Sequence, residues 1–141
     1  MNYKSLISNK NIKFNGPYVF SPKVYKDPRG YFFESWNRNT FNEILGEKID
    51  FVQDNQSKSS IGVLRGLHYQ LPPMGQAKLV RVTQGIVYDV IVDLRKESNT
   101  FSQWGGVKLS EENNNENLIF SNRPLCYKSH ICFLIQKQLP Q

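Results

Sequence analysis

Residues 51–95 read FVQDNQSKSSIGVLRGLHYQLPPMGQAKLVRVTQGIVYDVIVDLR, and this stretch decides the fold. Its second half predicts a β-hairpin, with strands over residues 78–83 and 86–94 and a turn at Gln84-Gly85. Apolar residues fall on both faces of the second strand, which indicates a strand covered on both sides. The stretch therefore favours a β-sandwich.

The sequence before and after this stretch also has the hydrophobic pattern of β-structure. Short apolar or aromatic runs predict further strands, and polar turns separate them. These strands are expected over residues 18–25, 31–36, 51–53, 61–70 and 101–109. The sequence KDPRG at 26–30 predicts a turn, because Asp-Pro opens turns and Gly30 accepts a positive φ. Residues 1–16 and 111–117 are polar and predict no strand.

One helix is predicted, over residues 39–46. Thr40 can cap its start, Glu43 stands at the capping-box position, and Gly46 can end it. Short strands at regular spacing with a single helix predict one all-β domain over residues 1–141, an antiparallel sandwich or barrel.

The composition is that of a soluble globular domain, with 39% hydrophobic and 21% charged residues. The net charge of +6 and the pI of about 9.4 suit an anionic ligand such as a phosphate ester, a nucleic acid, or a well-hydrated surface. The basic residues are spread along the chain, which argues against a nucleic-acid-binding arm. The N-terminus lacks the apolar core of a signal peptide, and no apolar run can span a bilayer, so we expect a cytoplasmic protein.

His68 is the candidate for acid–base chemistry, because histidine titrates near neutral pH. Arg65 and Lys78 are cations close to it in sequence. A base beside cations can remove a proton next to a carbonyl while a cation stabilises the enolate oxygen. A hydrogen-bonded structural histidine among surface cations fits the same spacing. In a regular strand Arg65 and His68 face opposite ways, unless a bulge at Gly66 realigns them.

A metal site is not expected. Gly62 and His68 have the spacing that opens a metal-binding cupin motif, but Gln70 stands where the second histidine of HxH belongs. A structural zinc site is not expected either, because the spacing of Cys126 and Cys132 and of the two histidines does not match that of a zinc-ligand motif.

Several segments together resemble one family. They are SPKVYKDPRGYFFESWN, FVQDNQSKSSIGVLRGLHYQLPP, QAKLVRVTQGIVYDVIVDLR and the strand with Phe101 and Trp104. Over about residues 17–118 the chain resembles the dTDP-4-dehydrorhamnose 3,5-epimerases, and GVLRGLHYQ followed by KLVRV is the most specific part. The resemblance implies a cupin-type jelly roll.

The resemblance also implies roles for individual residues. The histidine of RGLH, His68, is implied to be the catalytic base, and Lys78 of KLVRV to help stabilise the enolate. The remaining matched positions are implied to contact the substrate or its nucleotide. These positions are Arg29, Glu34, Gln53, Asn55 and Arg65. No metal or cofactor is implied, and the family is usually a dimer whose N-terminal strand segment reaches toward the partner's site.

The C-terminus departs from the family pattern. Where the family has a second histidine in AHGF, a tyrosine acid and an aspartate that pairs with the base, residues 120–141 read FSNRPLCYKSHICFLIQKQLPQ. Tyr127 and His130 are out of register with those groups. We expect a shifted or truncated reading frame near Phe120, with the last strands of the jelly roll missing and residues 120–141 aberrant.

Three functions are open on this basis. The first is epimerisation at C3 and C5 of a dTDP-4-keto-6-deoxyhexose, as in dTDP-L-rhamnose biosynthesis for O-antigen and lipopolysaccharide carbohydrate. The second is a catalytically impaired nucleotide-sugar-binding remnant. The third is a related cupin 3,4-ketoisomerase. The expected partners are a dTDP-linked keto-sugar and a second copy of the chain, and neither nucleic acid nor a membrane is expected.

Overall fold

The computed structural model describes residues 1–70, 73–113, 116–119 and 135–138. Within these residues the chain forms ten strands and one helix. The elements are β1 (Asn2–Ile7), β2 (Lys13–Ser21), β3 (Tyr25–Asp27), β4 (Gly30–Phe32), α1 (Arg38–Leu45), β5 (Leu64–Arg65), β6 (Lys78–Arg81), β7 (Ile86–Val92), β8 (Trp104–Ser110), β9 (Glu116–Ile119) and β10 (Ile135–Gln138). The prediction of an all-β fold with one short helix is confirmed.

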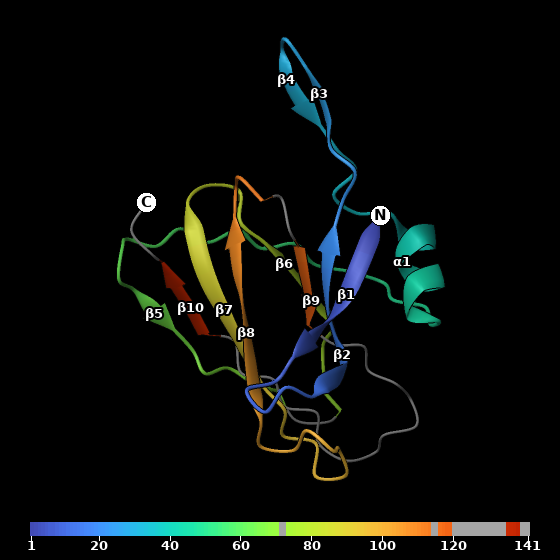
Figure 1. Cartoon of the computed structure of the whole chain (residues 1–141), viewed down its shortest axis with the longest axis vertical. Helices are drawn as coiled ribbons and strands as arrows, with labels where there is room; N and C mark the ends of the chain where they lie inside the picture. Colours follow the sequence, from blue (N-terminus) through green and yellow to red (C-terminus); the bar gives the residue numbers. More distant parts are fainter. Residues whose placement is uncertain (71–72, 114–115, 120–134, 139–141) are drawn as a thin grey trace.

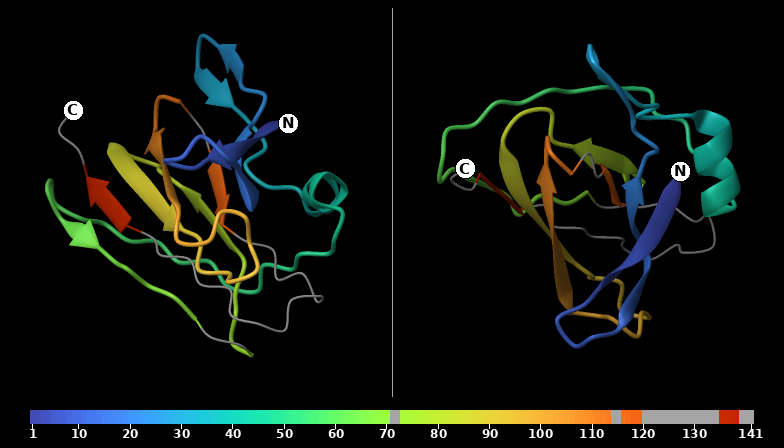
Figure 2. Two further views of the ribbon diagram at one scale, coloured as in Figure 1. Left: turned by 60° about the horizontal axis from the view of Figure 1, so that its bottom comes forward. Right: turned by 45° about the horizontal axis from the view of Figure 1, so that its top comes forward.

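Two antiparallel four-stranded sheets make up the body of the molecule. Their strand orders are β1-β2-β9-β6 and β5-β10-β7-β8. β3 and β4 form a separate hairpin that stands clear of both sheets in every view (Figure 1, Figure 2). The turn predicted at KDPRG is confirmed, because Asp27 and Gly30 are paired across this hairpin and Gly30 has φ 135°.

The prediction that residues 78–94 form a β-hairpin is wrong. β6 pairs with β9 in one sheet, whereas β7 pairs with β8 and β10 in the other. The turn at Gln84-Gly85 is present, but there the chain passes from one sheet to the other. Two strands that are consecutive in the sequence can pair in one sheet, or they can face each other across a core in different sheets. Both arrangements produce the same alternation of apolar and polar side chains. Periodicity alone does not separate these arrangements.

Several strand boundaries also differ from expectation. β1 lies where no strand is predicted, because Leu6 is its only buried residue and so the apolar pattern is weak. The strand predicted over 61–70 is reduced to β5, and residues 51–53 form none. The run expected over 31–36 contributes only β4. These segments are rich in aromatic and β-branched residues, which is typical of strands. In the structure most of these residues are not paired with another strand.

The core between the sheets is small and apolar. Leu6, Phe14, Val19 and Ile91 are buried in one cluster, and Val80 and Val107 pack against it. The cluster thus draws side chains from five strands, β1, β2, β6, β7 and β8. At one end, β1 and β8 approach closely: the backbone N–H of Asn9 donates to the Trp104 carbonyl at 2.7 Å. This contact closes one side of the sandwich.

A second core lies beneath α1. Phe41 and Leu45 of the helix are buried with Phe20 of β2, and the Phe20 and Phe41 rings lie 4.6 Å apart. Gly46 ends the helix with φ 68°, as predicted. The predicted cap is wrong: Asn37, not Thr40, accepts the hydrogen bonds at the helix start.

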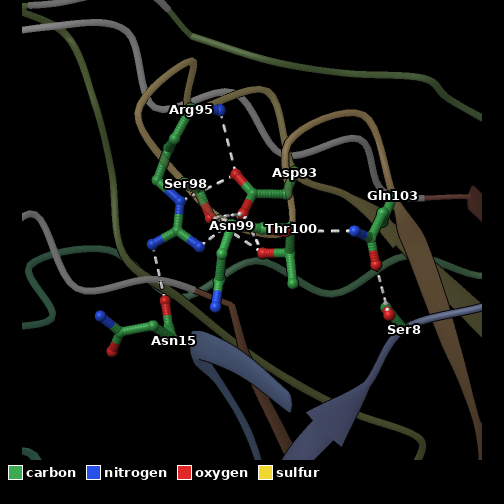
Figure 3. A network of polar contacts seen from close by, with 8 residues as sticks. All are labelled: Ser8, Asn15, Asp93, Arg95, Ser98, Asn99, Thr100 and Gln103. Atoms are coloured by element: carbon green, nitrogen blue, oxygen red, sulfur yellow. Dashed lines mark hydrogen bonds and ion pairs between the residues drawn. The ribbon is translucent and has the colours of Figure 1, made fainter. Parts of the chain in front are cut away.

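The loop after β7 is organised by one carboxylate, that of Asp93. It accepts hydrogen bonds from Arg95, Ser98 and Thr100 at 2.6–2.9 Å (Figure 3). Arg95 also donates to the carbonyl of Asn15 at 2.6 Å, which ties the loop to β2. The loop is therefore held by polar contacts rather than by an apolar core.

Candidate active site

The segment that carries His68 runs from one sheet to the other. β5 is an edge strand of one sheet and β6 an edge strand of the other, while β1 and β8 are the opposite edges. His68 follows β5 by three residues and precedes Lys78, the first residue of β6, by ten. The candidate base thus lies in the connection between these two edge strands.

Arg65 is fixed in place by the preceding loop. Its Nε donates to Ser59 Oγ at 2.8 Å, and its Nη2 donates to the carbonyl of Lys58 at 3.1 Å. β5 ends at Arg65 and Gly66 follows with φ 121°. His68 therefore lies outside the strand. The alternation of side chains that would place His68 and Arg65 on opposite faces of a regular strand does not apply, and no bulge is needed to bring them to one face.

His68 itself is exposed to solvent. It forms no hydrogen bond or ion pair with another residue of the described part of the chain. Lys78 is half-buried at the start of β6. An accessible imidazole can take a proton from a bound molecule, and a half-buried ammonium can stabilise a nearby oxyanion. No described carboxylate orients the imidazole ring.

Two of the expected nucleotide contacts belong to the projecting hairpin and its base. Arg29 lies at the hairpin turn, where its side chain is 90% exposed and forms an ion pair of 2.6 Å with Asp27. The Arg29 guanidinium lowers the pKa of the Asp27 carboxyl. Glu34 follows the hairpin and accepts a hydrogen bond from Asn37 Nδ2 at 3.0 Å. Neither residue contacts Arg65 or Lys78 through a hydrogen bond or ion pair within the described residues.

Gln53 and Asn55 lie in the extended segment that crosses from α1 toward β5. Gln53 Nε2 donates to Asn55 Oδ1 at 3.1 Å, and both residues are exposed. Their side chains are therefore brought together, and each retains further donors and acceptors for a ligand.

The described residues contain no cluster of three or more metal-ligating side chains. No helix among them has the length and apolar character needed to cross a membrane. Tyr127 and His130, the out-of-register C-terminal residues, lie outside the described part of the chain.

Residues 11–122 match the family model of dTDP-4-dehydrorhamnose 3,5-epimerase. The chain belongs to this family. The epimerase of Shigella flexneri is 60% identical over 95 residues, which are 67% of this chain and 52% of that protein. The chain spans about half the length of the curated relatives it matches.

Solved epimerase structures share the fold. The dTDP-6-deoxy-D-glucose-3,5-epimerase of Legionella pneumophila, in complex with dTDP-4-keto-L-rhamnose, is 38% identical with a TM-score of 0.79, over 98% of this chain and 66% of that one. A 3′-monoepimerase of Streptomyces bikiniensis, in complex with dTDP-quinovose, is 28% identical with a TM-score of 0.78, over 91% of this chain and 60% of that one. The predicted family and its cupin-type fold are confirmed.

Sequence reasoning missed a further candidate in this epimerase fold, Asp89. It lies in the middle of β7, fully buried, on the same face as Ile91 and Asp93. A carboxylate inside a sandwich is costly unless it is paired, and such groups are common at functional sites. The signal in the sequence is the aspartate inside the apolar run IVYDVIV, which strand parity places on the face of Ile91.

Proposed function

We propose that the chain is an isomerase that epimerises a dTDP-linked 4-keto-6-deoxyhexose at C3 and C5, in the cytoplasm and without a metal or cofactor. The family match over residues 11–122 carries this proposal, because it contains all seven residues expected to form the site. The molecule bound to the Legionella pneumophila relative, dTDP-4-keto-L-rhamnose, has the corresponding chemistry, a ketone at C4 of a dTDP-linked sugar.

In the proposed reaction His68 is the base. C3 and C5 both flank the C4 ketone, so a proton at either carbon is acidic. His68 takes that proton, the C–H electron pair forms a carbon–carbon double bond to C4, and the negative charge passes to the C4 oxygen. Lys78 and Arg65 stabilise this oxyanion as cations. A proton from solvent water then adds to the same carbon from the opposite face, and the electron pair returns from the C4 oxygen, which restores the ketone with the inverted centre. His68 passes its own proton back to solvent, and no net oxidation occurs.

The nucleotide is proposed to bind through Arg29, Glu34, Gln53 and Asn55. Arg29 is the exposed cation that suits a diphosphate. Because the Arg29 hairpin projects from its own body, we propose a homodimer in which it reaches the site of the partner. All six residues of β3 and β4 are exposed, and an isolated two-stranded hairpin is marginally stable in water, which supports a covering partner.

A nucleotide-sugar-binding remnant is the second candidate. One observation favours it: His68 has no orienting carboxylate among the described residues. General acid–base partners commonly contribute about 10²–10⁴-fold each to rate, so such a base works slowly at best.

Solvent exchange tests the proposal. The protein is incubated with dTDP-4-keto-6-deoxyglucose in D₂O, and the sugar C3 and C5 protons are followed by NMR. We expect deuterium at both carbons, and a loss of about 10²-fold or more in His68→Asn. Exchange at C3 alone indicates a monoepimerase, and a shifted carbonyl indicates a ketoisomerase.

Two controls make the result specific. Lys78→Met is expected to slow exchange, whereas Lys108→Met, which removes an exposed lysine of β8, is expected to leave it unchanged. Folding is checked by circular dichroism and dTDP binding by calorimetry for each variant. A folded protein that binds dTDP but exchanges no proton contradicts the epimerase and supports the remnant.

A further inference from the structure

The side chain of Asn37 makes contacts at both of its ends. Its Oδ1 accepts hydrogen bonds from the backbone N–H groups of Asn39 at 3.0 Å and Thr40 at 3.2 Å, which caps α1. Its Nδ2 donates to Glu34 Oε1 at 3.0 Å. One amide thus joins the start of a helix to the carboxylate at the base of the projecting hairpin.

The two ends fix the orientation of this amide. Backbone N–H groups can only donate, so the acceptor end of Asn37 must face the helix. An ionised carboxylate can only accept, so the donor end faces Glu34. Aspartate or serine at this position also caps a helix, but neither offers an amide donor to a carboxylate.

The segment that contains Glu34 is held to the body of the molecule by the residues that follow it in the chain. Trp36 packs edge-on against Phe51 at 6.1 Å, and Phe51 in turn packs against the core beneath α1. On its other side Glu34 follows the exposed hairpin, whose residues are not buried against the body. The orientation of the Glu34 carboxylate therefore depends on contacts that come after it in the chain, and Asn37 makes the direct one.

We infer that Asn37 is a positioning residue for nucleotide binding, which uses the N-cap of α1 to hold the Glu34 carboxylate ready for the ligand. The inference rests on the proposed function, in which Glu34 contacts the nucleotide. It assigns α1 a role beyond covering the core, because the helix start fixes the amide that orients the carboxylate.

Calorimetric titration with dTDP tests this inference. Asn37→Asp keeps the cap but replaces the donor with a like charge, so we expect the dissociation constant for dTDP to rise about 5-fold, as for loss of one hydrogen bond. Asn37→Ser also keeps the cap and removes the donor without adding charge, and a smaller rise is expected. Asn39→Asp is the matched control, since it adds the same charge at the helix start and leaves Nδ2 of Asn37 in place.

A double-mutant cycle separates positioning from structure. In a Glu34→Ala background, Asn37→Asp is expected to have no further effect on dTDP binding, and the melting temperatures of the Asn37 variants are expected to match that of Asn39→Asp. Equal effects of Asn37→Asp and Asn39→Asp, or the same effect with and without Glu34, overturn the inference. Two outcomes overturn the nucleotide role of Glu34 and the inference together. In the first, the wild-type protein does not bind dTDP; in the second, Glu34→Ala leaves the dissociation constant for dTDP unchanged.

Discussion

At the scale of single residues, Asp93 decides how the loop after β7 is held. Its side chain is 2% exposed. Burial of this carboxylate raises its pKa, but hydrogen bonds from Arg95, Thr100 and Ser98 outweigh that effect and bring the pKa to about 2 (Figure 3). The folded state thus binds the Asp93 proton more weakly than the unfolded chain, whose aspartates titrate near pH 3.8.

This difference makes part of the stability depend on pH. A carboxyl with a lowered pKa in the folded state stabilises the fold above its unfolded pKa, and this contribution is lost as the pH falls from about 4 to about 2. We expect Asp93 to contribute on the order of 2 kcal/mol at neutral pH. Chemical denaturation between pH 7 and pH 2 measures it, and Asp93→Asn should remove much of the pH dependence in the acid range.

Asp50→Asn is the matched control for Asp93→Asn. Asp50 forms an ion pair with Arg38 at 2.7 Å, but both side chains are more than half exposed. Loss of an exposed pair changes stability by at most about 1 kcal/mol, whereas breaking a buried one costs about 3–5 kcal/mol. Similar losses in the two variants would contradict the structural role of Asp93.

At the scale of elements, the sandwich depends on the approach of β8 to β1. A Cβ atom added at Gly105 would lie 2.6 Å from the carbonyl oxygen of Ile7 and 2.8 Å from Phe14 Cε2. The first of these is backbone, which cannot move aside without disturbing β1. Glycine at this position therefore allows the two sheets to meet at one edge.

Gly105→Ala is expected to destabilise the fold by about 2–3 kcal/mol through overpacking. Gly46→Ala provides the comparison, because a Cβ there meets open space and only the positive φ of 68° opposes it. Its expected cost is about 1 kcal/mol. Urea denaturation of both variants measures the two losses in the free energy of unfolding. A smaller loss for Gly105→Ala than for Gly46→Ala would show that β1 can shift to make room for the added Cβ at little cost.

At the scale of the whole molecule, the projecting hairpin is the feature that its own body does not explain. Tyr31 is 61% exposed and Phe32 is 69% exposed. Figure 1 shows the hairpin extending beyond the ends of both sheets. Exposed aromatic residues on a projecting element are typical of a protein–protein contact.

Sedimentation tests the proposed dimer. We expect the wild-type chain to sediment as a dimer and the double variant Tyr31→Ser, Phe32→Ser to dissociate at least about 10-fold more readily, because each buried aromatic ring contributes on the order of 1 kcal/mol or more. Val52→Ser removes a single apolar side chain that is 89% exposed and is not part of the hairpin, and it is expected to have no effect. A wild-type monomer at micromolar concentration would contradict the dimer.

The sequence by itself determined the class of fold, the turn before Gly30, the end of the helix at Gly46 and the family. These features depend on local conformational preference or on a contiguous motif such as GVLRGLHYQ, and both are written in neighbouring residues. The seven expected site residues were named from this motif and from the other segments that resemble the family, and their catalytic and binding roles stay predictions.

Only the tertiary structure decided which strands pair and which carboxylates are buried. β6 and β7 are adjacent in sequence but belong to different sheets, because their partners β9 and β10 come from much later in the chain. Asp89 is buried in the middle of β7, between the neighbouring strands β10 and β8. Asp93 is buried because the loop that follows it brings Arg95, Ser98 and Thr100 onto its carboxylate. Such contacts depend on distances in space that a one-dimensional pattern does not contain.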